Sequence, residues 1–427
     1  MTVLIYIING LILFGIAFYL YKVKSGLRPF FIPAFTLKIL SGIGIGILYS
    51  SYYTFGDTWS YFHEANRLLE LSKQDFNGYL SYLVSSDAYI FESIYLGRPR
   101  AIFFTKIVSV LSFITGQNYW LISAYFSLAT FTCLWFLATK LDKLFPKNKV
   151  AILLSILFLP SAVFWSSGII KESFAVCFAA LIVIQYLKWS VDKKVDLLSI
   201  ILFTVSSVIL WKIKYYYAAG LISIVIASLI VQLTLENSQL SKYGKKGILV
   251  MYTLLLFSAL LVIGLIKPTI GINNLIHPIV VNNQAFVERS EVGDYIQYYN
   301  LHESWWSIII NTPNALFSGL FRPFLWEVDS FFKLVYSLEN LLMLVLVIFR
   351  LKSMPKSLSN SSLIHVIGII LFTFIMISFL ALSAPNYGTL IRYKSMVVPF
   401  FVLLLTIDQP YFQKLNSLSI WKGKLKD

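Results

Sequence analysis

Residues 363–383 read LIHVIGIILFTFIMISFLALS, an apolar run without a single Asp, Glu, Lys or Arg. A helix of about 20 such residues is long enough to cross the ~30 Å hydrocarbon core of a membrane. Comparable runs recur along the 427-residue chain, which is 58% hydrophobic and only 13% charged, with a mean hydropathy of +0.76. Because backbone groups in lipid must bond within their own segment, we expect these runs to be helices. The sequence therefore predicts an all-α, polytopic integral membrane protein.

The apolar runs predict about eleven transmembrane helices in a single membrane domain that covers residues 1–427. The first run lacks a basic leader and a small-residue cleavage site, so we expect it to be retained as a helix. The spacing of the runs places the crossings near 2–21, 30–54, 118–139, 150–167, 173–190, 197–212, 215–234, 248–266, 331–349, 363–383 and 391–407.

Basic residues between the predicted crossings gather on one side of the membrane. That side holds 20 of the 35 Lys and Arg residues with only six acids, whereas the other side carries nearly equal numbers of bases and acids. Because cytoplasmic loops are enriched in Lys and Arg, we expect a cell (inner or plasma) membrane protein with its N-terminus outside and its C-terminus cytoplasmic. The net charge of +15 then reflects lysines that favour anionic lipid headgroups, and we expect no nucleic-acid partner.

Two long loops, 56–117 and 267–330, are predicted on the extracytoplasmic side. Residues 101–115, AIFFTKIVSVLSFIT, are apolar enough to cross the membrane, but a crossing there would move the lysines at 140–149 outside. We therefore expect 99–115 to form an interfacial or re-entrant helix of the first loop. Both cysteines, Cys133 and Cys177, fall inside predicted spans, so no disulfide framework or cysteine metal site is indicated.

The first polar cluster is FGDTWSYFHEANRL at 55–68, directly after the second span. On a helix, Asp57, Tyr61 and Glu64 share one face. A carboxylate at the membrane rim can act as a general base on an acceptor hydroxyl or can hold a metal ion. The alternative is that Asp57, with Ser60 nearby, merely caps the start of a helix.

Two further clusters carry lysines at the same side of the membrane. The segment PSAVFWSSGIIKESF at 160–174 contains Lys171 and Glu172, and WKIKYYYAAG at 211–220 contains Lys212 and Lys214. One interpretation is that Lys171, oriented by Glu172, faces a phosphate or carboxylate. The alternatives are a tight turn with a snorkelling lysine for the first segment and an interfacial tyrosine belt for the second.

The second long loop combines acidic and aromatic residues. Its run ERSEVGDYIQYYNLHESWW at 288–306 suits either a sugar-stacking surface or an amphipathic helix at the headgroups. The following GLFRPFLWEVDS at 319–330 contains Arg322 and Glu327, and an arginine there suits bidentate recognition of phosphate or carboxylate.

A last polar cluster, SAPNYGTLIRYKSMVVP at 383–399, places Arg392 within the final span. A guanidinium at membrane depth is costly unless it is paired, so a functional partner is the default expectation. The rival is a structural salt bridge to an acid such as Glu339. Eight polar residues of these clusters are predicted at one outer surface: Asp57, Lys171, Glu172, Lys212, Lys214, Arg322, Glu327 and Arg392. This pattern suits a substrate with an anionic head and a lipid tail.

At three places the chain resembles the C-type membrane glycosyltransferases (the GT-C fold) and the related exopolysaccharide and O-antigen polymerases. These are a G-D-x-x-x-Y pattern from Gly56 to Tyr61, an RPRAIFF segment at 98–104 ahead of the predicted interfacial helix, and a late Arg392-Tyr393 ahead of Pro399. The architecture covers most of the chain, and the motifs themselves are short.

The resemblance implies that Asp57 is the catalytic acid–base residue and that Tyr61 and the other outer polar residues bind substrate. It further implies that Lys171, Arg322 and Arg392 bind the phosphate of a polyprenyl-phosphate-linked glycan donor. In the family the aspartate often helps to hold a divalent cation such as Mg²⁺ or Mn²⁺. Here Thr58 stands where a second acid is common, so the pattern supplies no second ligand.

We therefore expect a glycosyltransferase that transfers a sugar or oligosaccharide to a glycan, lipid or protein acceptor at the extracytoplasmic face, in cell-surface polysaccharide or glycoconjugate biosynthesis. No nucleotide-binding glycine fingerprint is present, which agrees with a donor other than a cytosolic nucleotide sugar. The alternatives are a flippase for lipid-linked oligosaccharides, which would place its polar residues near the bilayer midplane, and a non-catalytic assembly partner.

Overall fold

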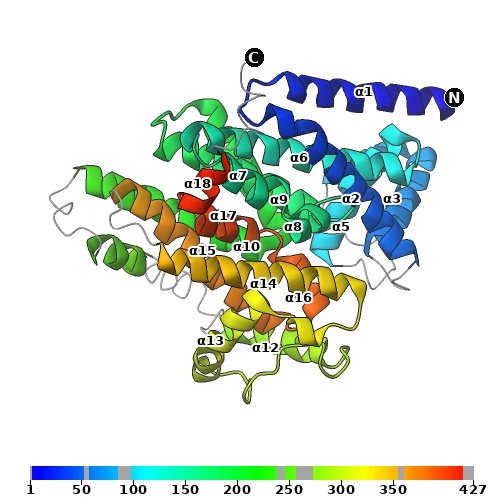
Figure 1. The fold of residues 1–427 in the computed structure, drawn as a ribbon. Coiled ribbons are helices and arrows are strands. Elements are labelled where there is room, and N and C mark those ends of the chain that lie inside the picture. Colours follow the sequence, from blue (N-terminus) through cyan, green and yellow to red (C-terminus); the bar gives the residue numbers. More distant parts are fainter. Residues whose placement is uncertain are drawn as a thin grey trace.

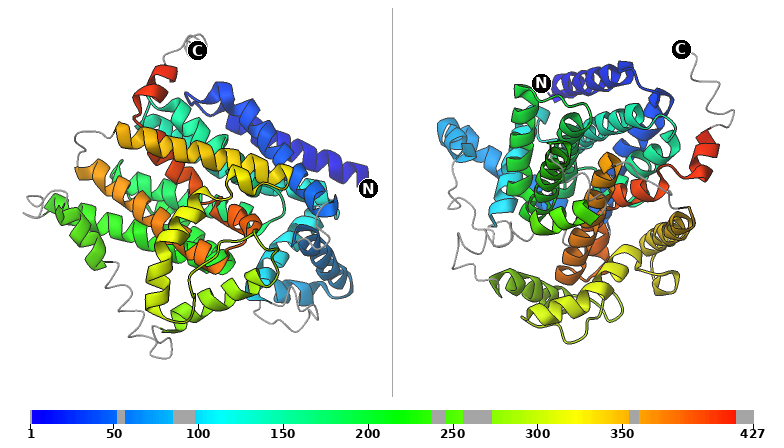
Figure 2. Two further views of the ribbon diagram at one scale, coloured as in Figure 1. Left: turned by 60° about the horizontal axis from the view of Figure 1, so that its bottom comes forward. Right: turned by 90° about the vertical axis from the view of Figure 1, so that its left-hand side faces the viewer.

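The computed structural model describes residues 2–51, 57–84, 98–237, 246–255, 273–353 and 360–416. This part of the chain is built from helices and their connections, and its only β pairing is an isolated bridge between Tyr295 and Asn386. The predicted all-α class is thus confirmed. Figures 1 and 2 show long helices such as α1, α6, α14 and α15 with their axes roughly aligned and α3 at one end of them.

The N-terminal part contains the first two long helices and the predicted interfacial helix, which packs against α3. That helix, α5, ends at Gly116 with a left-handed φ of +64°, and the side chain of Asn118 then caps α6. The elements are α1 (Thr2–Lys22), a 3₁₀ turn (Arg28–Phe30), α2 (Phe31–Ser51), α3 (Asp57–Gln74), α4 (Phe76–Val84), α5 (Pro99–Thr115) and α6 (Tyr119–Leu144).

The remaining helices alternate between long apolar ones and short ones at their ends. The central elements are α7 (Lys149–Ile152), a π-helical turn (Leu153–Leu157), α8 (Pro160–Trp165), α9 (Lys171–Ser190), α10 (Leu197–Asn237) and a helix Lys246–Leu255. The C-terminal elements are α12 (Asn273–Val287), α13 (Trp305–Phe321), a 3₁₀ turn (Leu325–Glu327), α14 (Phe331–Lys352), α15 (Asn360–Ser383), α16 (Tyr387–Lys394), α17 (Val398–Thr406) and α18 (Pro410–Asn416).

Seven helices of the described chain are long and apolar enough to cross a membrane, and an eighth is obtained if the bent pair α16–α17 is one span. Many of their large apolar side chains face outward, among them Leu11 and Phe14 of α1, as expected for contact with lipid. These helices correspond to the predicted crossings 2–21, 118–139, 173–190, 197–212, 215–234, 331–349 and 363–383, and to residues 30–51 of the predicted crossing 30–54, whose last three residues lie outside the described part. A multi-pass membrane protein is thus supported.

Helix α10 folds back on itself at Lys214, where the backbone is non-helical (φ −145°, ψ 76°). Ser199, in the first half of α10, accepts a hydrogen bond on its Oγ from Trp189 Nε1 of α9 at 2.8 Å. Gln232, in the second half of α10, donates through Nε2 to Ser190 O of α9, also at 2.8 Å. A straight helix would separate residues 199 and 232 by about 50 Å, so both halves meet the end of α9 only if the chain reverses. The predicted pair 197–212 and 215–234 corresponds to these two halves.

Helix α9 separates two sets of charges by about one membrane thickness. At its start, Glu172 pairs with Lys214, and just past its end, Asp192 pairs with Lys140 and Lys193 with Glu236. Glu172 and Ser190 are about 27 Å apart at 1.5 Å per residue, close to the ~30 Å of a hydrocarbon core. Lys140, Asp192, Lys193 and Glu236, all predicted on the basic side, therefore lie at one end of α9, and Glu172 and Lys214, predicted on the other side, lie at its opposite end.

Two predicted crossings differ from single straight helices, and a third lies partly outside the described residues. The segment 150–167 is divided into α7, a π-helical turn and α8, because Pro160 begins a new helix and cannot continue the preceding hydrogen-bond ladder. The segment 391–407 is divided into α16 and α17, which meet at 65°. Of 248–266, residues 256–266 lie outside the described residues.

Candidate active site

Four helices bring oppositely charged side chains together at one end of the bundle. Asp57 begins α3, Glu172 lies in the first turn of α9, and Arg392 lies near the end of α16. Arg392 Nη2 donates to Asp57 Oδ2 at 2.8 Å, Arg392 Nε lies 2.8 Å from Glu172 Oε1, and Arg392 Nη1 donates to Tyr49 Oη at 3.0 Å. The guanidinium thus links two carboxylates and the end of α2.

The reversal of α10 supplies the fourth member of this network. Lys214 Nζ donates to Glu172 Oε1 at 2.7 Å and lies 4.0 Å from the centroid of the Tyr393 ring. Glu172 and Lys214 are only 2% and 3% exposed. Breaking such a buried pair is strongly destabilising, because the remaining charge is left without a partner. This contact also accounts for the break in α10, since Lys214 turns inward to meet Glu172.

Residues close to the starts of α3 and α9 fix where these two helices begin. Thr58 shares a 2.7 Å hydrogen bond with the Tyr119 hydroxyl, and the Trp59 indole donates to Gly46 O at 3.0 Å, which together fix the first turn of α3. The turn before α9 needs Gly168, whose φ is +69° and where an added Cβ would lie 3.2 Å from Gly42 O. These contacts set the positions of Asp57 and Glu172.

Lys171 adds a third cation to this network. Its Nζ lies 5.2 Å from the centroid of the Tyr61 ring, and it makes no ion pair or hydrogen bond within the part of the chain that the structure describes. The sequence offered the interpretation that Glu172 orients Lys171. In the structure, Glu172 Oε1 is instead bound by Lys214 and Arg392. The network therefore contains three cations and two carboxylates, an excess of one positive charge that favours an anionic ligand.

One buried acceptor in the network has no donor. Glu172 Oε2 has no hydrogen-bond partner among the described residues, although its neighbour Oε1 receives two cations. A buried carboxylate oxygen without a donor costs free energy, and a ligand hydroxyl or a water would satisfy it. The arrangement can therefore hold a phosphate through its cations and a hydroxyl through its carboxylates.

The geometry does not fit a divalent metal ion between the carboxylates. Arg392 contacts both Asp57 and Glu172, so its guanidinium occupies the position at which a bridging cation would stand. Within the described ranges there is also no group of three His, Cys, Asp or Glu side chains that suits a metal. The Mg²⁺ or Mn²⁺ that the resemblance implies therefore has no ready ligand set here.

Arg322 and Glu327 form a second pair beside the first network. The Arg322 guanidinium binds the Glu327 carboxylate, which also accepts from Phe324 N at 2.7 Å and from the Tyr387 hydroxyl at 3.3 Å. Burial raises the pKa of Glu327, but the hydrogen bonds from Arg322 and Phe324 N outweigh it and hold that pKa below its usual value. Tyr387 and Arg392 share α16 and are about 7.5 Å apart along its axis, so the two clusters are neighbours.

Lys212 is not brought into either cluster. It is exposed, and its Nζ lies 5.3 Å from the centroid of the Phe103 ring. Its neighbour Lys214 points inward, and Tyr217 is buried with its hydroxyl bonded to Tyr393 O, so 211–220 is not a simple interfacial tyrosine belt. The structure places Lys212 apart from the network around Lys214, and its role in substrate binding stays a prediction.

The suggested salt bridge between Arg392 and Glu339 does not form. Glu339 accepts from Ser161 N at 2.8 Å and from the Ser161 hydroxyl, and so ties α14 to α8. Buried Lys38 and Lys394 are likewise satisfied, the former by Ser166 and the latter by Gly319 O, Leu320 O and Asn340 Oδ1. These deep charges join helices to one another.

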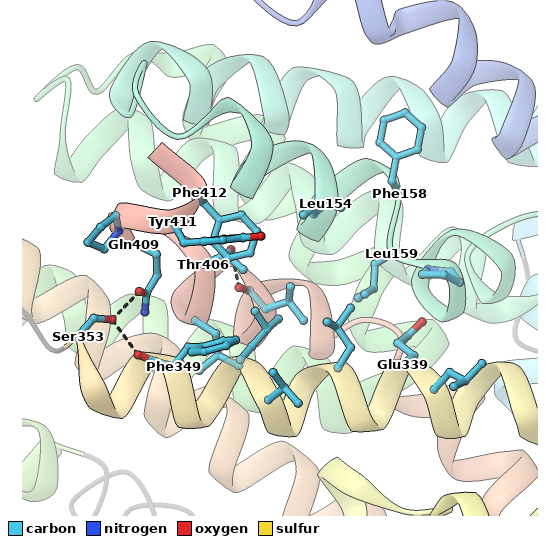
Figure 3. Close-up of a pocket in the computed structure, with 18 of the residues that line it drawn as sticks. Leu154, Phe158, Leu159, Glu339, Phe349, Ser353, Thr406, Gln409, Tyr411 and Phe412 are labelled. Atoms are coloured by element: carbon cyan, nitrogen blue, oxygen red, sulfur yellow. Dashed lines mark hydrogen bonds between the residues drawn. The ribbon is translucent and has the colours of Figure 1, made fainter. Parts of the chain in front are cut away.

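An apolar groove runs along α14 below the first network. It has a volume of about 860 Å³, lies against α17 and the π-helical turn, and follows α14 from Val335 to Ser353, about 27 Å. Figure 3 shows Glu339 and Leu159 toward one end and Ser353, Gln409 and Tyr411 toward the other. Tyr336, next to Val335, packs with Trp165 and Ile391, so the groove begins beside the residue that precedes Arg392.

Sequence reasoning missed several residues that build this end of the bundle. Tyr49 binds Arg392, but no spacing or motif in the sequence marks it, and Tyr393, which covers Lys214, was noted only as the neighbour of Arg392. Cys133 and Cys177, assigned only to spans, lie with their Sγ atoms 2.8 Å apart as buried free thiols.

Comparisons with protein-family models, curated proteins and solved structures find no match for this chain. The function therefore has to be argued from the residues and their geometry.

Proposed function

We propose that the protein is a membrane glycosyltransferase that uses a polyprenyl-phosphate-linked sugar or oligosaccharide at the extracytoplasmic face. The observation that carries the proposal is the contact of Arg392 with both Asp57 and Glu172, beside Lys171 and Lys214. Three cations and two carboxylates meet at the rim of an apolar helical body. This is the charge pattern that a phosphate leaving group and an attacking hydroxyl require.

The proposal includes the finer membrane topology. We infer eleven crossings, with the N-terminus and the loops 56–117 and 267–330 outside and the C-terminus in the cytoplasm. The basic residues at the far end of α9 support this orientation. Labelling with a membrane-impermeant maleimide tests it in a protein without native cysteines. Glu288→Cys should be labelled in intact cells and Lys194→Cys should not, and the reverse pattern would refute the orientation.

In the proposed reaction, the cations hold the donor phosphate and the carboxylates act on the acceptor. Lys171 binds the donor phosphate, and Arg392 turns from Asp57 toward the same phosphate as negative charge develops on it. Asp57 is then free to accept the proton of the acceptor hydroxyl, which attacks the anomeric carbon as the sugar–phosphate bond breaks. A positioned general base typically contributes about 10²–10⁴-fold to the rate.

Glu172 positions the cations. It remains bound to Lys214, and its second oxygen is available to a donor hydroxyl. Because the buried pair Glu172–Lys214 is joined to Arg392, the network holds its shape before substrate arrives, which is the condition for electrostatic stabilisation of a transition state.

The apolar groove beside α14 supports a lipid-linked substrate. Its length of about 27 Å matches the hydrocarbon core, and its upper end lies beside Ile391 and therefore next to Arg392. We propose that a polyprenyl tail lies in this groove while its phosphate reaches the cations. Tail binding then orients the reacting phosphate, which lowers the entropic cost of the reaction.

The flippase alternative draws less support from the structure. A transport pathway needs polar groups that exchange partners with the cargo, and the buried charges Lys38, Lys394 and Glu339 each have protein partners that join two helices. Within the charged network, Lys171 and the unpaired Glu172 Oε2 both lie at the start of α9 instead of midway along it.

The surface-glycan and lipid-linked-oligosaccharide profile of a deletion strain tests the proposal. Wild type should restore the missing glycan, and Asp57→Asn, expressed and folded at the same level, should leave the lipid-linked donor to accumulate. Restoration by both versions would refute the catalytic role of Asp57, and an unchanged glycan profile in the deletion strain would refute glycosyl transfer.

A further inference from the structure

A polar cavity of about 500 Å³ lies beside the Arg322–Glu327 pair, on the loop side of the bundle. One wall is the loop 292–297, which contributes Asp294, Tyr295 and Gln297. The other wall is the turn 322–329, which contributes the ion pair, Trp326 and Asp329. A cavity of this volume is within the range of small-ligand sites, about 300–1,000 Å³.

The loop wall is held in place by backbone hydrogen bonds to the start of α16. Ile296 N donates to Pro385 O at 3.1 Å, and Tyr387 N donates to Asp294 O at 3.0 Å. Gly293 has a left-handed φ of +98°, which lets the chain turn directly before Asp294. The cavity is therefore a built feature whose wall shares α16 with Arg392.

The carboxylates of the cavity are already neutralised by protein cations. Lys333 binds both Asp294 and Asp329, and Arg322 binds Glu327. A divalent metal would have to displace an ammonium and a guanidinium, and an anion would face three carboxylates. Each carboxylate can still accept further hydrogen bonds, because the two oxygens of one carboxylate offer about four acceptor positions.

Trp326 adds a flat apolar surface to these acceptors. It is 81% exposed, and its ring stacks on Phe324 with centroids 4.7 Å apart and planes at 24°. A large indole that is exposed to water, here stacked on the half-buried Phe324 ring, is typical of a contact surface. An apolar ring face next to several acceptors matches a ligand that has a C–H face and a rim of hydroxyl donors.

We propose that this cavity is a binding site for an uncharged saccharide of one or two rings, stacked on Trp326 and hydrogen-bonded to Asp294 and Asp329. That the saccharide is the glycosyl acceptor rests on the proposed function. The shared helix supports this role, since Tyr387 at the cavity and Arg392 in the charged network are about 7.5 Å apart along α16. A sugar chain bound in the cavity would extend its terminal hydroxyl toward Asp57.

Isothermal titration calorimetry on the full-length protein in lipid nanodiscs tests the site. The neutral probes are cellobiose, lactose and chitobiose, and the anionic probe is digalacturonate. At least one neutral disaccharide should bind, digalacturonate should bind more weakly than it, and Trp326→Ala should weaken binding by at least about tenfold. Because Trp326 is exposed, this variant should keep the wild-type melting temperature, which is measured in parallel.

Trp306→Ala is the matched control, because Trp306 is also exposed, at 69%, but does not line the cavity. It should leave disaccharide affinity unchanged. The proposal is overturned if no neutral disaccharide binds at tens of millimolar, if digalacturonate binds best, or if Trp306→Ala and Trp326→Ala have the same effect.

Asp57→Asn separates this inference from the proposed function. Disaccharide binding that survives Asp57→Asn supports the cavity whether or not glycan synthesis is lost. If Asp57→Asn loses glycan product while the wild type binds no neutral disaccharide, the enzyme assignment stands and the saccharide site is refuted.

Discussion

Arg392 and Asp57 are 335 positions apart in the sequence, yet Arg392 Nη2 lies 2.8 Å from Asp57 Oδ2. The same guanidinium reaches Glu172 and Tyr49. One side chain thus joins α2, α3, α9 and α16 at the end of the bundle where Lys171 and Lys214 also lie. The stability of this end and its proposed chemistry depend on the same residue.

Replacing Arg392 should destabilise the protein. Arg392→Met removes the ion pairs of Arg392 with Asp57 and Glu172, and removing one partner of a buried pair costs about 3–5 kcal/mol. Arg392→Lys keeps the charge but cannot reach three acceptors with one ammonium, so it should lose part of this stability. Thermal unfolding in detergent or nanodiscs measures both variants.

Lys73→Met is the control for that measurement. Lys73 pairs with Glu70 on the exposed surface of α3, and such pairs contribute about 0–1 kcal/mol. Equal melting temperatures for Arg392→Met and Lys73→Met would show that the buried network does not stabilise the bundle.

Lys171 should act on substrate binding and not on stability. It has no ion-pair partner among the described residues, so Lys171→Met should unfold at nearly the wild-type temperature. If it binds the donor phosphate, its loss should lower kcat/KM for the lipid-linked donor by about tenfold or more, since charged hydrogen bonds contribute about 1.5–3 kcal/mol. Lys212→Met, which removes the exposed lysine over Phe103, should leave kcat/KM unchanged, and an equal loss in both variants would count against the assignment.

A bulky side chain in the α14 groove should hinder a long lipid tail. Leu342 lines the groove, whereas its neighbour Leu341, which is also exposed, does not. Leu342→Trp should raise KM for a long-chain polyprenyl donor and have little effect with a short-chain analogue, because a short tail leaves the groove partly empty. Leu341→Trp serves as the control, and a similar KM for the two variants with the long-chain donor would exclude the groove as the tail site.

The Arg322–Glu327 pair should stabilise the protein only above a limiting pH. The pKa of Glu327 lies below its usual value of 4.5 in the folded protein, so its contribution is complete above about pH 4.5 and is lost as pH falls through the folded pKa. The melting-temperature difference between wild type and Glu327→Gln should therefore be largest near neutral pH and shrink in acid. A melting-temperature difference that grows in acid would contradict this sign.

The sequence predicted the all-α class and the long apolar helices that the structure describes. Apolar length sets the helices, and the short polar interval at 212–214 already indicated two segments where α10 reverses. Lys140 pairs with Asp192 and Lys193 with Glu236, so these four residues, which the sequence analysis placed on one side, do lie near the same end of α9.

Which charged residues pair with one another could not be predicted from the sequence. Hydropathy gives the length of a span but not which helices lie side by side, so nothing marked Tyr49 or the contact of Glu172 with Lys214. The division of 150–167 and the bend before α17 were also missed, because an apolar run is equally apolar whether it is straight or broken. Of the predicted site residues, Asp57, Glu172, Lys214 and Arg392 form one network, Lys171 contacts Tyr61, and Arg322 with Glu327 forms the neighbouring pair.

The most direct test is the rate of lipid-linked donor consumption by purified protein in proteoliposomes, with wild type, Asp57→Asn and Glu70→Gln compared at equal folded concentration. Glu70 lies on the same helix but on its exposed surface, paired with Lys73. We expect Glu70→Gln to match wild type and Asp57→Asn to be slower by about 10²–10⁴-fold with intact melting behaviour. Donor consumption at the wild-type rate by Asp57→Asn would contradict the proposal that this carboxylate carries the chemistry.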